Sequence, residues 1–210
     1  MNQRATMRWR TEREATGSRG AWSVRAFDPE RDADAVSHLD TSYTSPQAYA
    51  VHRSGDVVAL APTAITAPHS ARAAIDPGAG PGAGRGAGPG PASAWTHARV
   101  AVLDGRIRGF LAWRCEPGGR MTVVQFHVDR PYRQRGGGRR LLDDALAEAR
   151  RAGATLAWLE TSSANHPAIT AARRLGFEIC GFDTTLYRGT PHQGEIAVFM
   201  AHPIDGDARG

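Results

Sequence analysis

Residues 121–160 switch from a strand pattern to a helix pattern and back, and this switch is the strongest constraint on the fold. The run MTVVQFHV at 121–128 alternates like a strand, and a basic, glycine-rich loop follows it. Apolar residues then recur at helical spacing until Gly153, and TLAWLE at 155–160 is typical of a buried strand. A strand, a helix and a strand in succession form a βαβ unit, so the two strands should be parallel.

The other segments predict a mixed sheet around this unit. Turn residues at 54–56 and 104–105 lie between pairs of strand-like runs, so two antiparallel hairpins should precede the unit. A helix capped by Asn165 and ended by Gly176 should follow it. The predicted fold class is therefore α/β, a mostly antiparallel mixed sheet with a central parallel βαβ unit and flanking helices. The remaining expected elements are a helix at 28–39 and strands at 22–26, 47–53, 57–61, 97–103, 107–114, 177–187 and 194–200.

Composition excludes several classes of enzyme. All 26 basic residues are Arg, so the chain has no Schiff-base lysine, no Walker-type phosphate loop and no kinase lysine. The nucleophile-elbow motif G-x-S-x-G is also absent. Two Cys cannot form a four-ligand zinc site, and we expect no metal and a reducing, cytoplasmic location.

The chain is expected to form one domain over 21–203, with tails at 1–20 and 204–210. Residues 76–93 are rich in Gly, Pro and Ala, which favours a flexible linker. The Arg-rich first tail holds five Arg and two Glu, so it carries three of the five net positive charges. The body is therefore nearly neutral, and we expect neither a nucleic-acid nor a membrane partner.

The loop of the βαβ unit has the composition of an anion site. Its sequence is Arg-Gln-Arg-Gly-Gly-Gly-Arg-Arg at 133–140. Glycines let a ligand approach the backbone closely, and the helix that follows presents free N–H groups and a positive dipole end. Such a loop can hold a pyrophosphate.

Residues 121–142 resemble the cofactor motif of the GNAT N-acetyltransferases, R/Q-x-x-G-x-G/A, here Arg133-x-x-Gly136-x-Gly138. The family's second signature, Asn-x-x-Ala before a helix that ends in Gly-Phe, occurs at 165–177. The resemblance covers roughly residues 21–203. It implies a GNAT-type fold, acetyl-CoA as co-substrate, and acetyl transfer to an amine.

Two longer stretches, at 39–60 and 158–200, are similar to streptothricin acetyltransferases. This closer resemblance implies antibiotic resistance through a small-molecule amine acceptor of the streptothricin type. Two alternatives stay open: a protein or peptide amine as acceptor, and a catalytically weakened acetyl-CoA-binding module. The oligomeric state, monomer or homodimer, also stays open.

The resemblance implies which residues bind acetyl-CoA. In the family, one strand supplies backbone donors to the thioester and pantetheine, the loop holds the pyrophosphate, and the helix-capping Asn contacts the pantetheine arm. Carried onto this chain, these residues are Phe126, Val128, Arg133, Arg135, Gly136, Gly137, Gly138, Arg139 and Asn165.

The catalytic candidates are His127 and Tyr187. His127 stands where many members carry a Glu base, and an ordinary His pKa of about 6.5 suits proton removal from an amine. The alternative is a His that only lines the cleft. Many members also carry a Tyr acid in the helix after Asn165, but Ala172 stands here. Tyr187 is the remaining acid candidate, and its alternative is a half-buried strand Tyr.

A cationic acceptor should be held by carboxylates and aromatic rings. The carboxylate candidates are Asp40, Glu160, Asp183 and Glu195. Of these we select Asp40 and Glu160, together with Tyr43, as the predicted acceptor-binding residues. The alternative for each carboxylate is a solvated charge or a partner for a nearby Arg.

Overall fold

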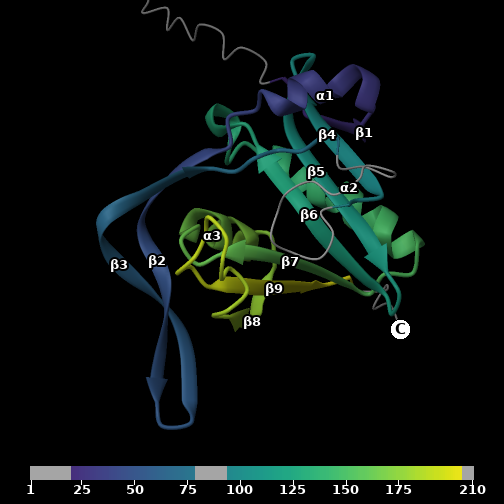
Figure 1. Ribbon diagram of the computed structural model, residues 1–210. Coiled ribbons are helices and arrows are strands. Elements are labelled where there is room, and N and C mark those ends of the chain that lie inside the picture. Colours follow the sequence, from purple (N-terminus) through teal and green to yellow (C-terminus); the bar gives the residue numbers. More distant parts are fainter. Residues whose placement is uncertain (1–19, 79–93, 205–210) are drawn as a thin grey trace, which may run out of the picture.

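In the computed structural model, which describes residues 20–78 and 94–204, a seven-stranded sheet forms the body of the protein (Figure 1). Its strand order is β1-β4-β5-β6-β7-β9-β8, and every neighbouring pair is antiparallel except β6 and β7. The predicted fold class is confirmed. The strands are β1 (Ser23–Ala26), β4 (His97–Leu103), β5 (Arg106–Glu116), β6 (Arg120–Val128), β7 (Leu156–Ser162), β8 (Glu178–Asp183) and β9 (Ala197–Pro203).

Helices cover both faces of this sheet. The connection from β6 to β7 is α2 (Gly137–Arg151), so the predicted βαβ unit is confirmed. Together with α3 (His166–Arg174), α2 covers one face, where Leu141 and Ile169 are fully buried. The shorter α1 (Pro29–Ser37) covers the other face and buries Val36 in a second core with Phe110. The sheet therefore lies between two apolar layers.

A long two-stranded ribbon stands apart from the sheet and curves away from the body (Figure 1). It consists of β2 (Ser42–Ser54) and β3 (Val57–Arg72), which are much longer than the predicted hairpin at 47–53 and 57–61. The prediction stopped at Pro62, because proline cannot donate to a strand ladder. A ribbon has two edge strands, however, and an edge strand tolerates proline.

The strand predicted at 177–187 is shorter in the structure, and the strand predicted at 194–200 is shifted to Ala197–Pro203. The strand expected at 177–187 ends at Asp183, whose carboxylate accepts hydrogen bonds from the backbone N–H of Thr185 at 2.6 Å and of Leu186 at 3.1 Å. This local bonding turns the chain, so Tyr187 lies in a turn and the strand location for it is wrong. Cys180 lies on β8, the edge strand of the sheet, and is exposed.

Some sequence-based predictions lie outside the described residues. The predicted tails at 1–20 and 204–210 fall almost wholly in the undescribed ranges 1–19 and 205–210, and the predicted linker at 76–93 overlaps the range 79–93. These predictions, and the single-domain boundaries of 21–203, stay predictions. In the described ranges, no helix is long and apolar enough to span a membrane.

Candidate active site

The two parallel strands of the sheet separate partway along their length. β6 and β7 are paired only from Arg120 to Val123, opposite Leu156 to Leu159. The pairing of β6 with β5 shifts register between Val123 and Gln125, so Val124 is the extra residue of a bulge. A bulge bends its strand. The C-terminal half of β6 thus continues without β7 beside it and leaves a gap in the ladder.

The glycine-rich loop lies at the end of this diverging half of β6. Gln134 and Gly136 have positive φ values of 61° and 91°, which turn the chain sharply before α2 begins at Gly137. Trp22 fixes the loop from outside, because its indole Nε1 donates to the Arg135 carbonyl at 2.7 Å. A Cβ on Gly137 would lie 2.6 Å from the Trp22 ring, so the loop admits no side chain there. No sequence motif predicts this role of Trp22.

At the start of α2 the backbone can accept an anion. Among the described residues, no side chain caps this helix, so its first N–H groups stay available. The positive end of the helix dipole adds to their attraction for negative charge. Beside it, a Cβ at Gly138 would lie 3.4 Å from Val128 and 3.7 Å from Phe126, so glycine keeps open a cradle that faces β6. These features fit a bound pyrophosphate.

Tyr187, Glu160, Tyr43 and Glu195 form an acidic and phenolic group, which we call the carboxylate–phenol cluster. The Tyr187 hydroxyl donates to the exposed Glu160 carboxylate. Burial, this hydrogen bond and the charges of Glu160 and Glu195 raise the pKa of Tyr187 far above its ordinary value. Burial and the Glu195 charge likewise raise the pKa of Tyr43. The cluster is thus electronegative and its phenols stay protonated.

Glu160 and His127 project to the same side of the sheet from the two diverging strands. On β7, Leu159 belongs to the core under α2 and α3, so the next residue, Glu160, faces the other way. On β6, Phe126 packs against that same core, so His127 also faces the other way, directly across from Phe110. His127 and Phe126 therefore lie on opposite faces of β6.

The chain was compared with known proteins. The streptothricin acetyltransferase of Streptomyces lavendulae is 36% identical over 173 residues, which cover 82% of this chain and 90% of that protein. The chain belongs to the GNAT acetyltransferase family. A model of the acetyltransferase (GNAT) family also matches residues 86–177, which hold β6, the loop and α2.

Solved structures agree with this assignment. The crystal structure of nourseothricin acetyltransferase has a TM-score of 0.72 and 33% identity, and the match covers 88% of this chain and 99% of that one. A Bacillus anthracis protein in complex with acetyl coenzyme A has a TM-score of 0.71 and 19% identity, covering 87% and 99%. The likeness to the Bacillus anthracis protein shows the fold. The family assignment makes the chain described here an N-acetyltransferase with acetyl-CoA as its co-substrate.

The Arg133 side chain of this acetyltransferase is hydrogen-bonded to the protein's own backbone. Its guanidinium donates to the backbone carbonyls of Ser42 at 2.8 Å, Val128 at 3.0 Å and Asp40 at 3.2 Å. Burial lowers the pKa of Arg133. This side chain ties the loop and the end of β6 to the ribbon, and its role in binding acetyl-CoA stays a prediction. Ser42 was not identified from the sequence.

The other predicted cofactor residues lie around the loop. The Arg139 guanidinium donates to the Arg174 carbonyl at 2.6 Å, at the C-terminal end of α3. Arg135 lies over the Tyr132 ring, 5.4 Å from its centre. The Asn165 side chain accepts from the Ala168 N–H at 3.2 Å, so its predicted role as a helix cap is confirmed. Its contact with the pantetheine arm stays a prediction.

The pKa of His127 is lower than the ordinary value expected from the sequence. Burial, with a smaller contribution from the Arg133 charge, lowers its pKa to about 4, where the sequence predicted the ordinary value near 6.5. The imidazole is therefore uncharged at neutral pH. In this form it can accept a proton, but it holds that proton weakly.

Asp40 lies beside Ser42, at the start of the ribbon. Its carboxylate accepts from the Ser42 N–H at 2.9 Å, and this bond, with the charges of Arg130 and Arg133, lowers the pKa of Asp40. The structure thus brings Tyr43 and Glu160 together and places Asp40 in the network around Arg133. Glu195, a candidate that was not selected, belongs to the cluster and also bonds Ser162 and His192, the latter at 3.2 Å.

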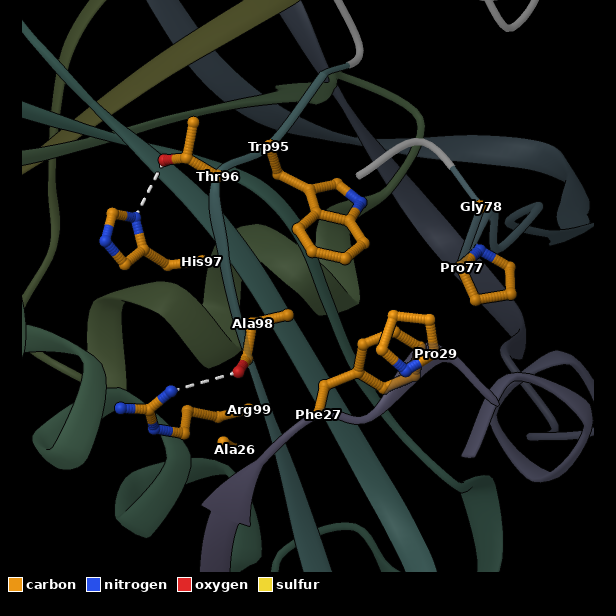
Figure 2. Close-up of a pocket in the computed structure, with 10 residues that line it drawn as sticks. All are labelled: Ala26, Phe27, Pro29, Pro77, Gly78, Trp95, Thr96, His97, Ala98 and Arg99. Carbon is orange, nitrogen blue, oxygen red and sulfur yellow. Dashed lines mark hydrogen bonds between the residues drawn. The ribbon is translucent and has the colours of Figure 1, made fainter. Parts of the chain in front are cut away.

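A hollow of about 440 Å³ lies elsewhere, lined by the end of β1, the start of β4 and the residues Pro77 and Gly78. Figure 2 shows Phe27, Pro29, Pro77 and Trp95 around it. It contains none of the predicted site residues. Its Arg99 side chain is engaged with α2 through Asp144 at 2.7 Å. We therefore place the active site at the divergence of β6 and β7 and not in this hollow.

Replacing Arg133 by Ala should destabilise the protein by about 2–4 kcal/mol, because three carbonyl groups lose a charged donor. Replacing the exposed Arg140 by Ala should change the free energy of unfolding by less than about 0.5 kcal/mol. Urea unfolding of both variants without acetyl-CoA measures the difference. Equal stability of the two variants would show that Arg133 does not hold the loop.

Proposed function

We propose that this acetyltransferase transfers the acetyl group of acetyl-CoA to an amine of a small cationic antibiotic of the streptothricin type. The observation that carries the proposal is the 36% identity to the Streptomyces lavendulae enzyme over nearly all of both chains. The carboxylate–phenol cluster beside the strand divergence supports it, because a cationic amine is attracted to such a surface.

On this proposal, acetyl-CoA lies along the diverging half of β6. The backbone of Phe126 and Val128 borders the thioester and pantetheine, and the loop from Gly136 to Gly138 and the start of α2 hold the pyrophosphate. Asn165 lies at the start of α3, on the pantetheine side. The loop binds chiefly through its backbone, and Arg135 and Arg139 add positive charge around it.

The transfer needs a deprotonated amine close to the thioester. The amine nitrogen forms a bond to the acetyl carbon, the carbon–sulfur bond breaks, and coenzyme A leaves as a thiolate. The amine loses one proton and the thiolate gains one. Holding both reactants in attack geometry, with donors to the carbonyl oxygen, supplies much of the acceleration.

A protein group is proposed for the amine end of this proton transfer. The uncharged His127 imidazole can accept the amine proton at neutral pH. Tyr187 is less suited to protonating the thiolate than the sequence implied, because its raised pKa makes it a weak acid. We propose instead that Tyr187 positions Glu160, through the hydrogen bond between them, to bind the ammonium form of the acceptor.

Ala172 stands where many family members carry a tyrosine acid, and this raises the alternative of a catalytically weakened acetyl-CoA-binding module. Ala172 is 7% exposed and belongs to the core under α3. Alanine has no proton to donate, so we propose that water supplies the proton to the thiolate. Slow turnover in the assay below would support this alternative.

A cytoplasmic location is part of the proposal. Cys115 and Cys180 are both free thiols in the structure, and Cys180 is exposed. Exposed free thiols persist in a reducing compartment.

Incubation with acetyl-CoA and a panel of amines should release free coenzyme A thiol with streptothricin at a kcat/KM at least about a hundredfold above that with peptides. The larger rate is expected because the cluster suits a small cationic acceptor. A thiol reagent follows the release. Turnover with peptides alone would overturn the antibiotic acceptor, and acetyl-CoA binding without turnover would show a non-catalytic module.

Replacing Glu160 by Gln should raise the KM for the antibiotic by about tenfold, because the acceptor loses one charge partner. The matched variant Asp40→Asn removes a carboxylate in the Arg133 network and should raise this KM less than about threefold. Steady-state kinetics at saturating acetyl-CoA measure both. An equal effect of the two substitutions would contradict the assignment of Glu160 to the acceptor.

Replacing His127 by Ala should lower kcat by about tenfold or more, with acetyl-CoA affinity retained, because the proton acceptor is lost. Since a base works only when unprotonated, the acid limb of kcat/KM in the native enzyme should follow a pKa of about 4. Activity should therefore not fall by half near pH ~6.5, the ordinary pKa of His. Unchanged kcat in the variant would exclude His127 as the base.

A further inference from the structure

The first half of β2 lies across the ends of the two diverging strands. Because β6 and β7 are paired only at their beginning, the opening between them is widest at their C-terminal ends. Ser42, the first residue of β2, is bonded to residues that follow β6, while Tyr49 is bonded to Ser163, the residue directly after β7. Residues 42–49, which we call the crossing segment, therefore span this opening before the ribbon leaves the body (Figure 1).

The start of the crossing segment is held against the end of β6 by several hydrogen bonds. The Arg130 N–H donates to the Asp40 carbonyl at 2.9 Å, and the Asp40 N–H donates to the Asp129 carboxylate at 3.2 Å. The Arg133 guanidinium adds its bonds to the Asp40 and Ser42 carbonyls. Asp129 is only 7% exposed, so this anchor is largely shielded from water.

The other end of the crossing segment is fixed at Tyr49, on the side of β7 and α3. The Tyr49 N–H donates to the Ser163 carbonyl at 2.9 Å. Its buried ring stacks on His166, with ring centres 5.6 Å apart, and the Arg173 guanidinium lies over it at 5.8 Å. The crossing segment is thus anchored to one diverging strand at each end and cannot shift as a free loop would.

Tyr43 lies within the crossing segment, directly after the first anchor. It is the residue that the ribbon contributes to the carboxylate–phenol cluster, where it feels the charge of Glu195. Consecutive Cα atoms are joined by a rigid trans peptide about 3.8 Å long, so a displacement of Ser42 is passed on to Tyr43. Glu160 is held separately, on β7. The shape of the cluster therefore depends on where Ser42 is held.

The Arg133 side chain is suited to setting this position. Its three bonds go to three different residues, and one of them is Val128, the last residue of β6. A guanidinium presents five donors in a rigid plane, whereas a lysine ammonium is a compact charge with three donors. A lysine therefore cannot reproduce the three bonds. One planar group thus fixes the start of the crossing segment relative to the strand proposed to border the thioester.

We propose that Arg133 is a positioning residue for the amine acceptor, because it holds Tyr43 at the place where the acceptor is bound beside the acetyl donor. The proposal rests on the acceptor site proposed above. It differs from the role that the family motif implies for Arg133, which concerns acetyl-CoA. Binding of the pyrophosphate by the loop backbone and the start of α2 does not need this side chain.

Two substitutions separate positioning from phosphate binding. Arg133→Lys keeps the charge but loses the planar donors, and Arg133→Gln loses the charge but is a residue that the family motif accepts. Both should raise the KM for the amine at least about tenfold, since a misplaced Tyr43 weakens binding of the acceptor. Both should change the dissociation constant of acetyl-CoA less than about threefold. Steady-state kinetics and calorimetric titration measure the two quantities.

A double-mutant cycle with Tyr43→Ala tests whether Arg133 acts through Tyr43. Once the tyrosine ring is removed, Arg133→Lys should raise the KM for the amine by less than about twofold. A residue that only stabilised the fold would give independent effects of the two substitutions. The control Arg151→Lys, on an exposed residue at the far end of α2, should leave both the KM and the acetyl-CoA affinity at their native values.

Three results would overturn the proposal: weaker acetyl-CoA binding with an unchanged KM for the amine, a native KM in Arg133→Lys, or additive effects in the cycle. The amine used is the one with the highest kcat/KM in the panel described above. Failure of the antibiotic as acceptor would therefore contradict the proposed function and leave this test in force. An enzyme that acetylates no amine would overturn both.

Discussion

The active site depends on a parallel pairing that lasts for only four residues of each strand. Val123 is the last residue of β6 that is paired with β7, and the bulge at Val124 then bends β6 away. If the pairing continued, the backbone groups of the two strands would bind each other. Because it stops, the sheet keeps an unpaired opening in its middle, and two core layers hold this opening in place.

The two ends of this opening are built by different means. At the cofactor end, the loop presents backbone N–H groups, and its shape is held by Trp22 and by the carbonyl contacts of Arg133. At the other end, where we propose that the acceptor binds, side chains from separate parts of the chain meet, with Tyr43 from the ribbon, Glu160 from β7 and Tyr187 from a turn. Arg133 connects the two ends, since it donates both to Val128 and to the start of the ribbon.

Sequence reasoning reached the parts of this arrangement that depend on local patterns. The βαβ unit, the capping of α3 by Asn165 and the face of β6 that carries His127 all follow from periodicity and caps. It did not reach what tertiary contacts decide. Burial lowers the His127 pKa, the Arg133 guanidinium donates to backbone carbonyls, and the Asp40 carboxylate accepts from the Ser42 N–H. The long ribbon was missed because Pro62 reads as a strand breaker until its edge position is known.

The division between backbone and side chains at the two ends affects how such an enzyme can change. The proposed phosphate site uses main-chain N–H groups, which every residue type except proline supplies, so what it demands is the backbone shape and the glycine that faces Trp22 at position 137. The proposed acceptor surface of Tyr43, Glu160 and Tyr187 can be altered one side chain at a time. New acceptor specificities are therefore expected from few mutations, while the loop proposed to hold the acetyl donor stays unchanged.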